Sequence, residues 1–404
     1  MKALFTAFFV FTMASFILAQ DGEKNWFQVY GFAMTDIGYN FDQIDPAWFD
    51  VVRPTKLPTM ENDPYYGTKG NAYFSARQTR FGVKSSTQTG LGELFTQFEW
   101  EFFGVGVDAG QTTIRLRHAY GELGQFGAGQ YWSPFMDIDV FPNTVEYWGP
   151  NGMAFFRNVQ FRYMPIKGDT RLTFALERPG ASADAGMYSN RIEIQNIKAR
   201  FPVPDLSAEY RSAHDWGYVE LAGIVRYMKW EDLYDEDEVD FSDDAIGWGL
   251  NLSSNIKLGK DNLVRLSVLY GAGVQNYMND APVDVAIDTS EKNGVAIPLL
   301  GVVAFLEHNW SDKFATAIGY SMLDVDNTDG QTYSAFSMGQ YAIGNLIYYP
   351  VENVMMGCEL QYGNRDNFNN LNENQEYPNG YLKSTDILKV QFSFKYNFSH
   401  KVFF

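Results

Sequence analysis

The sequence predicts an all-β fold: a transmembrane antiparallel β-barrel of about sixteen strands, with one loop folded inward as a constriction loop. Three observations lead to this prediction. The chain begins with an apolar segment of the kind that directs secretion, it contains many segments in which apolar and polar residues alternate, and it ends in an amphipathic segment that finishes on an aromatic residue. After the first segment, no apolar stretch approaches the ~20 residues that a transmembrane helix needs.

The N-terminal segment, residues 1–19, is expected to be a signal peptide that is removed from the mature chain. Lys2 supplies a positive charge, residues 3–18 are apolar and uncharged, and Ala19 is a small residue at the expected cleavage site. A retained anchor helix is the alternative, although the apolar run is short for a membrane span. Residues 20–404 are then expected to form one β-barrel domain in the outer membrane of a bacterium.

The composition narrows the expected partners. The single cysteine, Cys358, excludes an internal disulfide. The formal net charge of −18 argues against nucleic acid as a partner. It fits acidic surface loops that meet divalent cations among lipopolysaccharide headgroups, so outer-membrane lipid and lipopolysaccharide are the expected partners of the outer surface. No cofactor is expected.

The last predicted strand, residues 388–398, alternates with a period of two. One side of such a strand can face lipid while the other faces water. The chain then closes on Phe404, and an aromatic end to an amphipathic last strand resembles the signal that the barrel assembly machinery recognises in outer-membrane barrels. The last strand of a soluble β-sandwich is the alternative. The apolar face consists of Leu388, Val390, Phe392, Phe394, Tyr396 and Phe398, and the polar face of Lys389, Gln391, Ser393, Lys395 and Asn397.

Alternating segments of the length that a tilted spanning strand needs recur along the whole chain. Short and long connections alternate strictly between them, so that with a periplasmic N-terminus all short turns lie on the periplasmic side and all longer loops face outward. The count carries an error of about two strands, because residues 191–201 also alternate and could belong to a further strand. The predicted strands are 27–39, 72–84, 91–104, 111–122, 124–131, 153–164, 170–178, 205–213, 218–230, 245–257, 262–276, 296–310, 314–324, 332–349, 354–366 and 384–398.

Charged residues follow one face of several predicted strands. In residues 111–120, Arg115 and Arg117 lie opposite Ile114 and Leu116, while His118 falls on the apolar face with Tyr120. Charges packed this regularly need a wet interior, because a dry sandwich core would impose a large desolvation cost on them. The pattern therefore favours a barrel with a water-filled lumen over a sandwich.

One stretch of the chain resembles a known family. The motifs RLRHAYG (115–121), GQYWS (129–133) and RNVQFRY (157–163), preceded by RFGVK (80–84) and EWEFFG (99–104), are similar to those of the DcaP-like trimeric outer-membrane porins. The clear resemblance covers roughly residues 78–230. It implies a homotrimeric, sixteen-stranded diffusion porin with a loop folded into the lumen, through which small hydrophilic solutes pass, anionic dicarboxylate-like solutes among them. Some members carry a coiled-coil extension before the barrel, which the short spacing between the predicted cleavage site and the first strand does not accommodate.

The segment 132–152 is the candidate constriction loop. It follows a predicted strand, is too long for a turn, and carries the acids Asp137, Asp139 and Glu146. A pore selects solutes by the radius and the charges at its narrowest point, so acids on a loop and bases on the facing wall would orient dipolar solutes. By strand parity, the bases expected to point into the lumen are Arg80, Lys84, Arg115, Arg117, Arg162 and Arg171. The alternative is that these arginines only pair with the lumenal acids Glu93, Glu99 and Glu101.

Other functions are weighed against the porin. A hydrolase is not supported, since none of the four histidines is paired with a serine and an acid, and no paired-histidine metal spacing occurs. Residues 231–244 hold nine acids, but they lack the spacing of a helix–loop–helix calcium motif and are expected to form a solvated outer loop. A gated, substrate-specific barrel or a mainly structural one remains the alternative to a diffusion pore.

Overall fold

A computed structural model describes residues 25–180, 197–232, 242–288, 293–369, 371 and 376–404. The predicted signal peptide, residues 1–19, lies outside these residues, as do most of the alternating segment 191–201 and most of the acidic segment 231–244. No described helix is long and apolar enough to cross a membrane.

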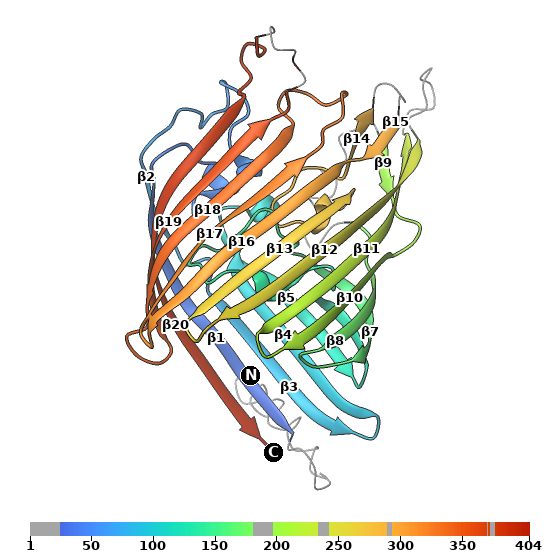
Figure 1. Ribbon diagram of the computed structural model, residues 1–404, viewed down its shortest axis with the longest axis vertical. Coiled ribbons are helices and arrows are strands. Elements are labelled where there is room, and N and C mark those ends of the chain that lie inside the picture. The colour runs from blue at the N-terminus through green and yellow to red at the C-terminus, as the bar shows by residue number, and fades with distance from the viewer. Residues whose placement is uncertain (1–24, 181–196, 233–241, 289–292, 370, 372–375) are drawn as a thin grey trace, which may run out of the picture.

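The described chain forms a closed antiparallel barrel whose wall contains sixteen strands (Figure 1). Two of these strands are interrupted: β2 and β3 both pair with β1, and β9 and β10 both pair with β11. Pro202 and Pro204 lie between β9 and β10, where they have no N–H to donate to the ladder. The strands are β1 (Trp26–Asn40), β2 (Asn71–Ser75), β3 (Arg80–Thr89), β4 (Gly92–Phe103), β5 (Thr112–Leu123), β6 (Phe126–Trp132), β7 (Arg157–Ile166), β8 (Arg171–Glu177), β9 (Ile197–Arg200), β10 (Asp205–His214), β11 (Gly217–Asp232), β12 (Asp243–Leu258), β13 (Asn262–Ala272), β16 (Pro298–Ser311), β17 (Phe314–Val325), β18 (Phe336–Tyr348), β19 (Val354–Asn367) and β20 (Ser384–Phe403).

The first and last strands close the barrel. They pair without interruption from Trp26 opposite Phe403 to Asn40 opposite Lys389. Short turns join the strands at one end of the barrel and long loops join them at the other, where β14 (Val285–Asp288) and β15 (Asn293–Ala296) form a separate hairpin (Figure 1). The predicted strand number and the alternation of turns and loops are confirmed, and Ile197–Arg200 extends the eighth wall strand instead of adding another.

The two faces of the last strand differ as predicted. The side chain of Tyr396 is on the outer, exposed face, with 52% of its surface accessible, whereas Lys389 and Gln391 are fully buried inside. The outer wall presents a band of large apolar side chains, including Phe161, Leu250 and Leu306. Because the strands of the closed wall pair with neighbours on both sides, such a surface can lie in hydrocarbon.

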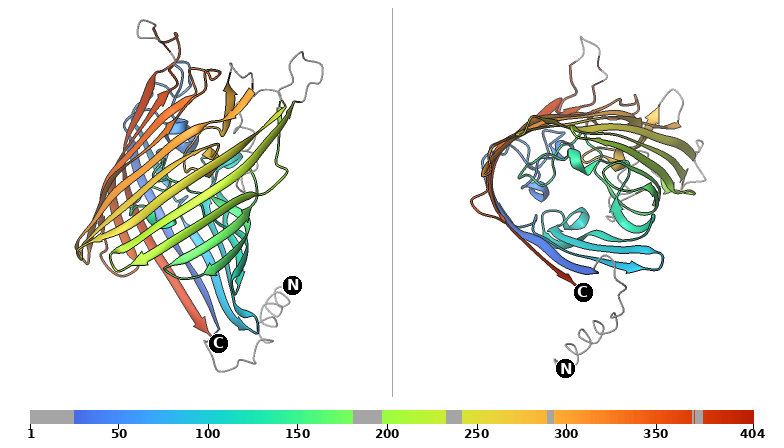
Figure 2. Two further views of the ribbon diagram at one scale, coloured as in Figure 1. Left: turned by 45° about the vertical axis from the view of Figure 1, so that its right-hand side comes forward. Right: turned by 60° about the horizontal axis from the view of Figure 1, so that its bottom comes forward.

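Loop segments fill part of the barrel interior. The end-on view in Figure 2 shows several of them inside the ring of strands. The largest buried apolar cluster packs loop residues such as Phe135 and Tyr277 against inward-facing Leu269 of β13 and Leu323 of β17. A hydrophobic packing layer therefore covers the inner surface of the β11–β18 side of the wall, and the charged side chains lie mainly on the remainder.

One predicted strand begins too early, and the predicted faces of another are wrong. The strand expected at 153–164 begins at Arg157, because Met153 and Ala154 are buried in the loop packing instead of alternating. The parity of residues 111–120 changes at a β-bulge, since Glu99 pairs with His118 while its neighbour Trp100 pairs with Leu116. The extra residue turns His118 and Tyr120 inward, although strict alternation had assigned them to the apolar face.

Candidate functional site: the charged lumen

The long connection between β6 and β7, residues 133–156, lies against inward-facing side chains from distant parts of the wall. Asn251 of β12 donates a hydrogen bond to the carbonyl of Phe135 (3.1 Å), and Gln391 of β20 donates to the carbonyl of Val145 (3.0 Å). These contacts place the connection inside the barrel, in agreement with the end-on view of Figure 2. It contains residues 133–152 of the predicted loop 132–152, and Trp132 is the last residue of β6. That this segment forms the narrowest point of the pore stays a prediction.

Glu359 of β19 anchors the middle of this loop. Its carboxylate accepts hydrogen bonds from the hydroxyl of Thr144 (2.6 Å), from the backbone N–H of Val145 (3.1 Å) and from that of Glu146 (3.3 Å). A fully buried carboxylate that accepts several hydrogen bonds, including charge-assisted bonds from backbone N–H groups, is a strong attachment point. The loop is therefore fixed to the wall through polar contacts as well as through its apolar residues.

Arginines from three strands converge on two glutamates of β4. The guanidinium of Arg117 contacts Glu99 (2.6 Å) and Glu101, and that of Arg80 lies 3.7 Å from Glu99 and 3.4 Å from Glu101. Arg115 lies 3.9 Å from Glu101. The structure thus brings three of the predicted bases together, and it pairs them with the acids that the alternative interpretation named. We call this group, together with Arg157, the arginine cluster.

Arg157 is the fourth arginine of the arginine cluster, and Tyr147 contacts the cluster from the loop. Sequence parity did not identify either residue. Strict alternation with Val159 and Phe161 would place Arg157 on the outer face, but it is the first residue of β7, directly after the loop. Its side chain is buried, 3.7 Å from Glu101. Tyr147 belongs to the loop, and its hydroxyl donates a hydrogen bond to Glu101. Among the described residues, four arginines therefore lie around the two glutamates Glu99 and Glu101.

The remaining predicted bases lie along the same side of the lumen. Lys84 is next to the ring of Tyr30, with its ammonium 4.7 Å from the ring centre. Arg171 pairs with Glu209 (3.2 Å) and Glu220 (2.7 Å). Arg162 faces inward below the loop, as parity predicted, but no described carboxylate forms an ion pair with it. Glu93, the third acid of the alternative interpretation, accepts a hydrogen bond from Ser86 (2.5 Å).

The loop acids do not contact the predicted bases. Asp137 accepts hydrogen bonds from Arg211 (2.6 Å), Tyr218 (2.7 Å) and Ser253 (2.6 Å), and Asp139 pairs with the same arginine (2.5 Å). Parity would also have placed Arg211 inside, since it lies two residues after Glu209 on its strand. The loop acids therefore oppose a wall arginine, but not one of the predicted bases, and the charges form two separate groups, one around Glu101 and one around Asp137.

Glu146 serves as a cap inside the loop. Its carboxylate accepts hydrogen bonds from the backbone N–H groups of Val52 (3.0 Å) and Gly149 (2.5 Å). Gly149 has a φ of +78°, and a Cβ there would lie 2.4 Å from the ring of Phe141, so the turn requires glycine. Burial raises the pKa of the Glu146 carboxyl to about 7, while Lys389 acts in the opposite direction.

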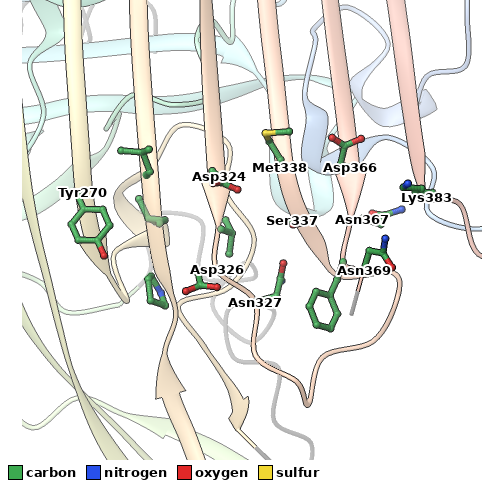
Figure 3. Close-up of a pocket in the computed structure, with 15 residues that line it drawn as sticks. Tyr270, Asp324, Asp326, Asn327, Ser337, Met338, Asp366, Asn367, Asn369 and Lys383 are labelled. Atoms are coloured by element: carbon green, nitrogen blue, oxygen red, sulfur yellow. The ribbon is translucent and has the colours of Figure 1, made fainter. Parts of the chain in front are cut away.

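A cavity of about 700 Å³ lies at the loop end of the barrel wall (Figure 3). It is lined by residues near the loop ends of β13 to β20, among them the outward-facing Tyr270 and the buried Leu299 and Val325. Among the described residues, no group of three or more His, Cys, Asp or Glu side chains is arranged to hold a metal ion.

Comparisons with known proteins agree with this architecture. The sequence model of a family described as DcaP outer membrane protein matches residues 19–379. No curated protein matches the chain. Among solved structures, the outer membrane channel DcaP of Acinetobacter baumannii is similar, with 21% identity, a TM-score of 0.77, and coverage of 94% of this chain and 99% of that one.

More distant structures share the fold. An anion-selective porin from Comamonas acidovorans has 11% identity and a TM-score of 0.60, with coverage of 93% of this chain and 100% of that one. OmpT, an outer membrane protein of Vibrio cholerae, has 13% identity and a TM-score of 0.54, with coverage of 95% and 100%. At these identities the similarity concerns the barrel itself.

Proposed function

The chain belongs to the DcaP outer membrane protein family, and from this premise and the charged lumen we propose that it is a porin through which small hydrophilic solutes diffuse, anions preferentially. It is a protein of the bacterial outer membrane. The barrel fold and the family indicate a channel and not an enzyme. The distribution of apolar and polar side chains supports the same location, because an apolar outer wall encloses a polar interior.

The observation that carries the proposed anion preference is the excess of arginine in the arginine cluster. Glu101 is fully buried and cannot by itself neutralise the four arginines that it and Glu99 contact. Fixed charges at a constriction determine which ions enter it, because a water-poor passage screens them weakly. The acidic net charge of −18 does not contradict this, since it is a sum over the whole chain and not over the lumen.

Several partners belong to this proposal. We expect lipid and lipopolysaccharide around the apolar outer wall, and a homotrimer formed through that wall. One of the structural relatives, OmpT of Vibrio cholerae, is described in a trimer form. We also expect the barrel assembly machinery to recognise the last strand through Phe404. Residues 133–156, with Asp137, Asp139 and Glu146, are proposed to narrow the pore, and the bases already named are proposed to select the solute.

The reversal potential across a planar bilayer with a potassium chloride gradient tests the proposed selectivity. The wild-type protein should be anion-selective, and Arg115→Gln should lower the ratio of chloride to potassium permeability by roughly twofold, because it removes one accessible positive charge from the arginine cluster. Lys260→Gln, which removes a charge from the exposed turn between β12 and β13, is the matched control. Cation selectivity, or equal shifts for both variants, would contradict the assignment, and a protein that forms no channel would favour a closed or structural barrel.

A further inference from the structure

A cavity of about 250 Å³ lies beneath the loop, on the turn side of the barrel. Its upper wall is the first part of the loop, from Ser133 to Ile138, and its side is the inner surface of β5 to β10. Near the turn between β7 and β8 it is bordered by Lys167 and Gly168, so it opens toward the periplasmic end. The volume corresponds to about eight water molecules at roughly 30 Å³ each, and it is therefore suited to a small ligand.

Arg162 faces this cavity without a carboxylate partner. Its guanidinium donates to the side-chain oxygen of Gln160 (3.0 and 2.7 Å) and to the carbonyl of Trp132, and no described acid lies within 4.0 Å of it. The neighbouring Glu177 instead accepts hydrogen bonds from Ser133 (2.7 Å) and Ser207 (2.5 Å). The side chain of Arg162 is only 7% exposed, and a buried cation is ordinarily stabilised by an anion.

One part of the cavity wall is apolar and aromatic, and the remainder carries the charged side chains of Glu122, Arg171 and Glu209. Pro134, Met136 and Ile138 contribute from the loop, and Met164 from β7. The guanidinium of Arg162 lies 5.1 Å from the centre of the Tyr131 ring and 5.4 Å from that of the Tyr120 ring, and Trp132 also lines the cavity. A flat apolar group can stack on such surfaces while its carboxylate reaches the guanidinium.

The cavity continues the charged path of the lumen. Trp132 joins the two regions, because its ring lies 5.4 Å from the guanidinium of Arg117 and its carbonyl accepts from Arg162. On the far side, Lys167 at the mouth pairs with Glu122 (2.6 Å) and is 42% exposed. An anion that passes the arginine cluster thus meets a second cation before it reaches the periplasmic mouth.

We propose that this cavity is a binding site for small anions with one carboxylate and a flat apolar body, such as aromatic carboxylates, with Arg162 binding the carboxylate. The inference rests on the proposed porin function, and it assigns to that pore a subsite on the periplasmic side of the loop. Occupancy would hold the anion in the lumen and so retard the other ions that pass. Chloride or acetate lacks the apolar body, and benzyl alcohol lacks the charge, so neither kind of molecule satisfies both parts of the wall.

Sodium benzoate is the probe for this site, with the full chain in a planar bilayer. Benzoate should reduce the single-channel current in a saturable manner, and it should act at lower concentration from the turn side than from the loop side. Sodium acetate and benzyl alcohol at the same concentrations should leave the current nearly unchanged. Arg162→Gln should raise the half-blocking benzoate concentration about tenfold, the effect of one charge-assisted hydrogen bond to a carboxylate.

Two further variants keep the test decisive. Lys167→Glu lies at an exposed position and should fold normally, yet its reversed charge at the mouth should also weaken the block by benzoate. Lys260→Gln, in another periplasmic turn, should leave the block unchanged. Calorimetric titration of benzoate into the detergent-solubilised protein gives the affinity independently of conduction.

The outcomes separate the subsite from the porin. An anion-selective channel whose benzoate block is absent, or is the same in Arg162→Gln and wild type, would overturn the subsite and leave the porin function intact. A silent protein that still binds benzoate in an Arg162-dependent manner would support the subsite and contradict the diffusion pore. Equal block by acetate would show that the cavity recognises charge alone, which contradicts the assigned ligand class.

Discussion

At the residue scale, the lumen shows how charged side chains are kept inside a barrel. Arg117 is almost fully buried, and its guanidinium bridges Glu99 and Glu101. The attraction between the guanidinium and the two carboxylates offsets the cost of removing these charges from water. Arg80 reaches the same two acids over longer distances and with 24% of its side chain exposed. The two arginines have the same partners but different access to water, and their contributions to stability should differ accordingly.

Replacement of Arg117 should therefore destabilise the barrel more than replacement of Arg80. Arg117→Ala leaves two buried glutamates without their closest cation, and we expect the free energy of unfolding to fall by about 3–5 kcal/mol. Arg80→Ala should cost clearly less, because water partly screens that pair. Urea unfolding in lipid vesicles, followed by tryptophan fluorescence, measures both. Equal losses would show that the burial of the ion pair does not decide its contribution.

The buried Glu146 predicts a pH dependence of stability. Its pKa rises from the ordinary value of 4.5 to about 7 on folding, so the folded protein retains a proton that the unfolded chain releases. The contribution of this group is fully present below about pH 4.5 and declines as the pH rises toward 7. The difference in free energy of unfolding between wild type and Glu146→Gln should change over that interval. A constant difference from pH 4 to pH 8 would show that the carboxyl titrates normally.

At the element scale, the connection 133–156 behaves as part of the interior and not as an outer loop. Its apolar residues pack on the β11–β18 side, and its backbone is bound by Glu359 and Gln391 from the far strands. Loops carry function because a rigid scaffold positions them, and here the barrel wall is that scaffold. The arginine cluster depends on it, since Tyr147 of the loop donates to Glu101.

Release of this loop should change conduction. Glu359→Ala removes the acceptor for the N–H groups of Val145 and Glu146, and we expect a larger and noisier single-channel conductance because the segment then moves in the lumen. Glu352→Ala removes the same charge from the exposed turn between β18 and β19 and serves as the control. Conductance that is identical in the two variants would mean that the loop does not limit the current.

At the scale of the whole molecule, the outer wall decides what surrounds the protein. Large apolar side chains are exposed around the barrel, and in water such a surface would lead to aggregation. We expect lipid to cover most of this surface, and contact between copies to cover the rest in a trimer. The structure described here is a single chain, so the trimer is a prediction at this scale.

The trimer can be tested directly. Native mass spectrometry of the protein extracted from outer membranes in mild detergent should give three times the mass of one chain, and chemical cross-linking in intact membranes should give dimer and trimer bands. Heating in dodecyl sulfate should convert the complex to a single band of unfolded chain. A monomer mass together with an absence of cross-linked bands would contradict the trimer.

The strand pattern was available from the sequence because each spanning strand has to satisfy lipid on one side and water on the other. That requirement imposes a period of two, which identifies all sixteen wall strands and the inward placement of bases such as Lys84 and Arg162. Short turns and long loops alternate because each strand crosses the membrane in the direction opposite to that of the strand before it. These features follow from local chemistry that a single strand already contains.

The arrangement inside the lumen was decided by tertiary structure. The bulge at His118 changes the parity within one strand, because the extra residue exchanges the inner and outer faces of the residues on one side of it. No residue type in the sequence marks the position of this bulge. Arg157 is buried because a loop returns to the wall there, and Asp137 selects Arg211 because packing of the loop brings them together. The sequence by itself determined a barrel with charges facing inward, while the pairing of those charges depended on contacts between residues far apart in the chain.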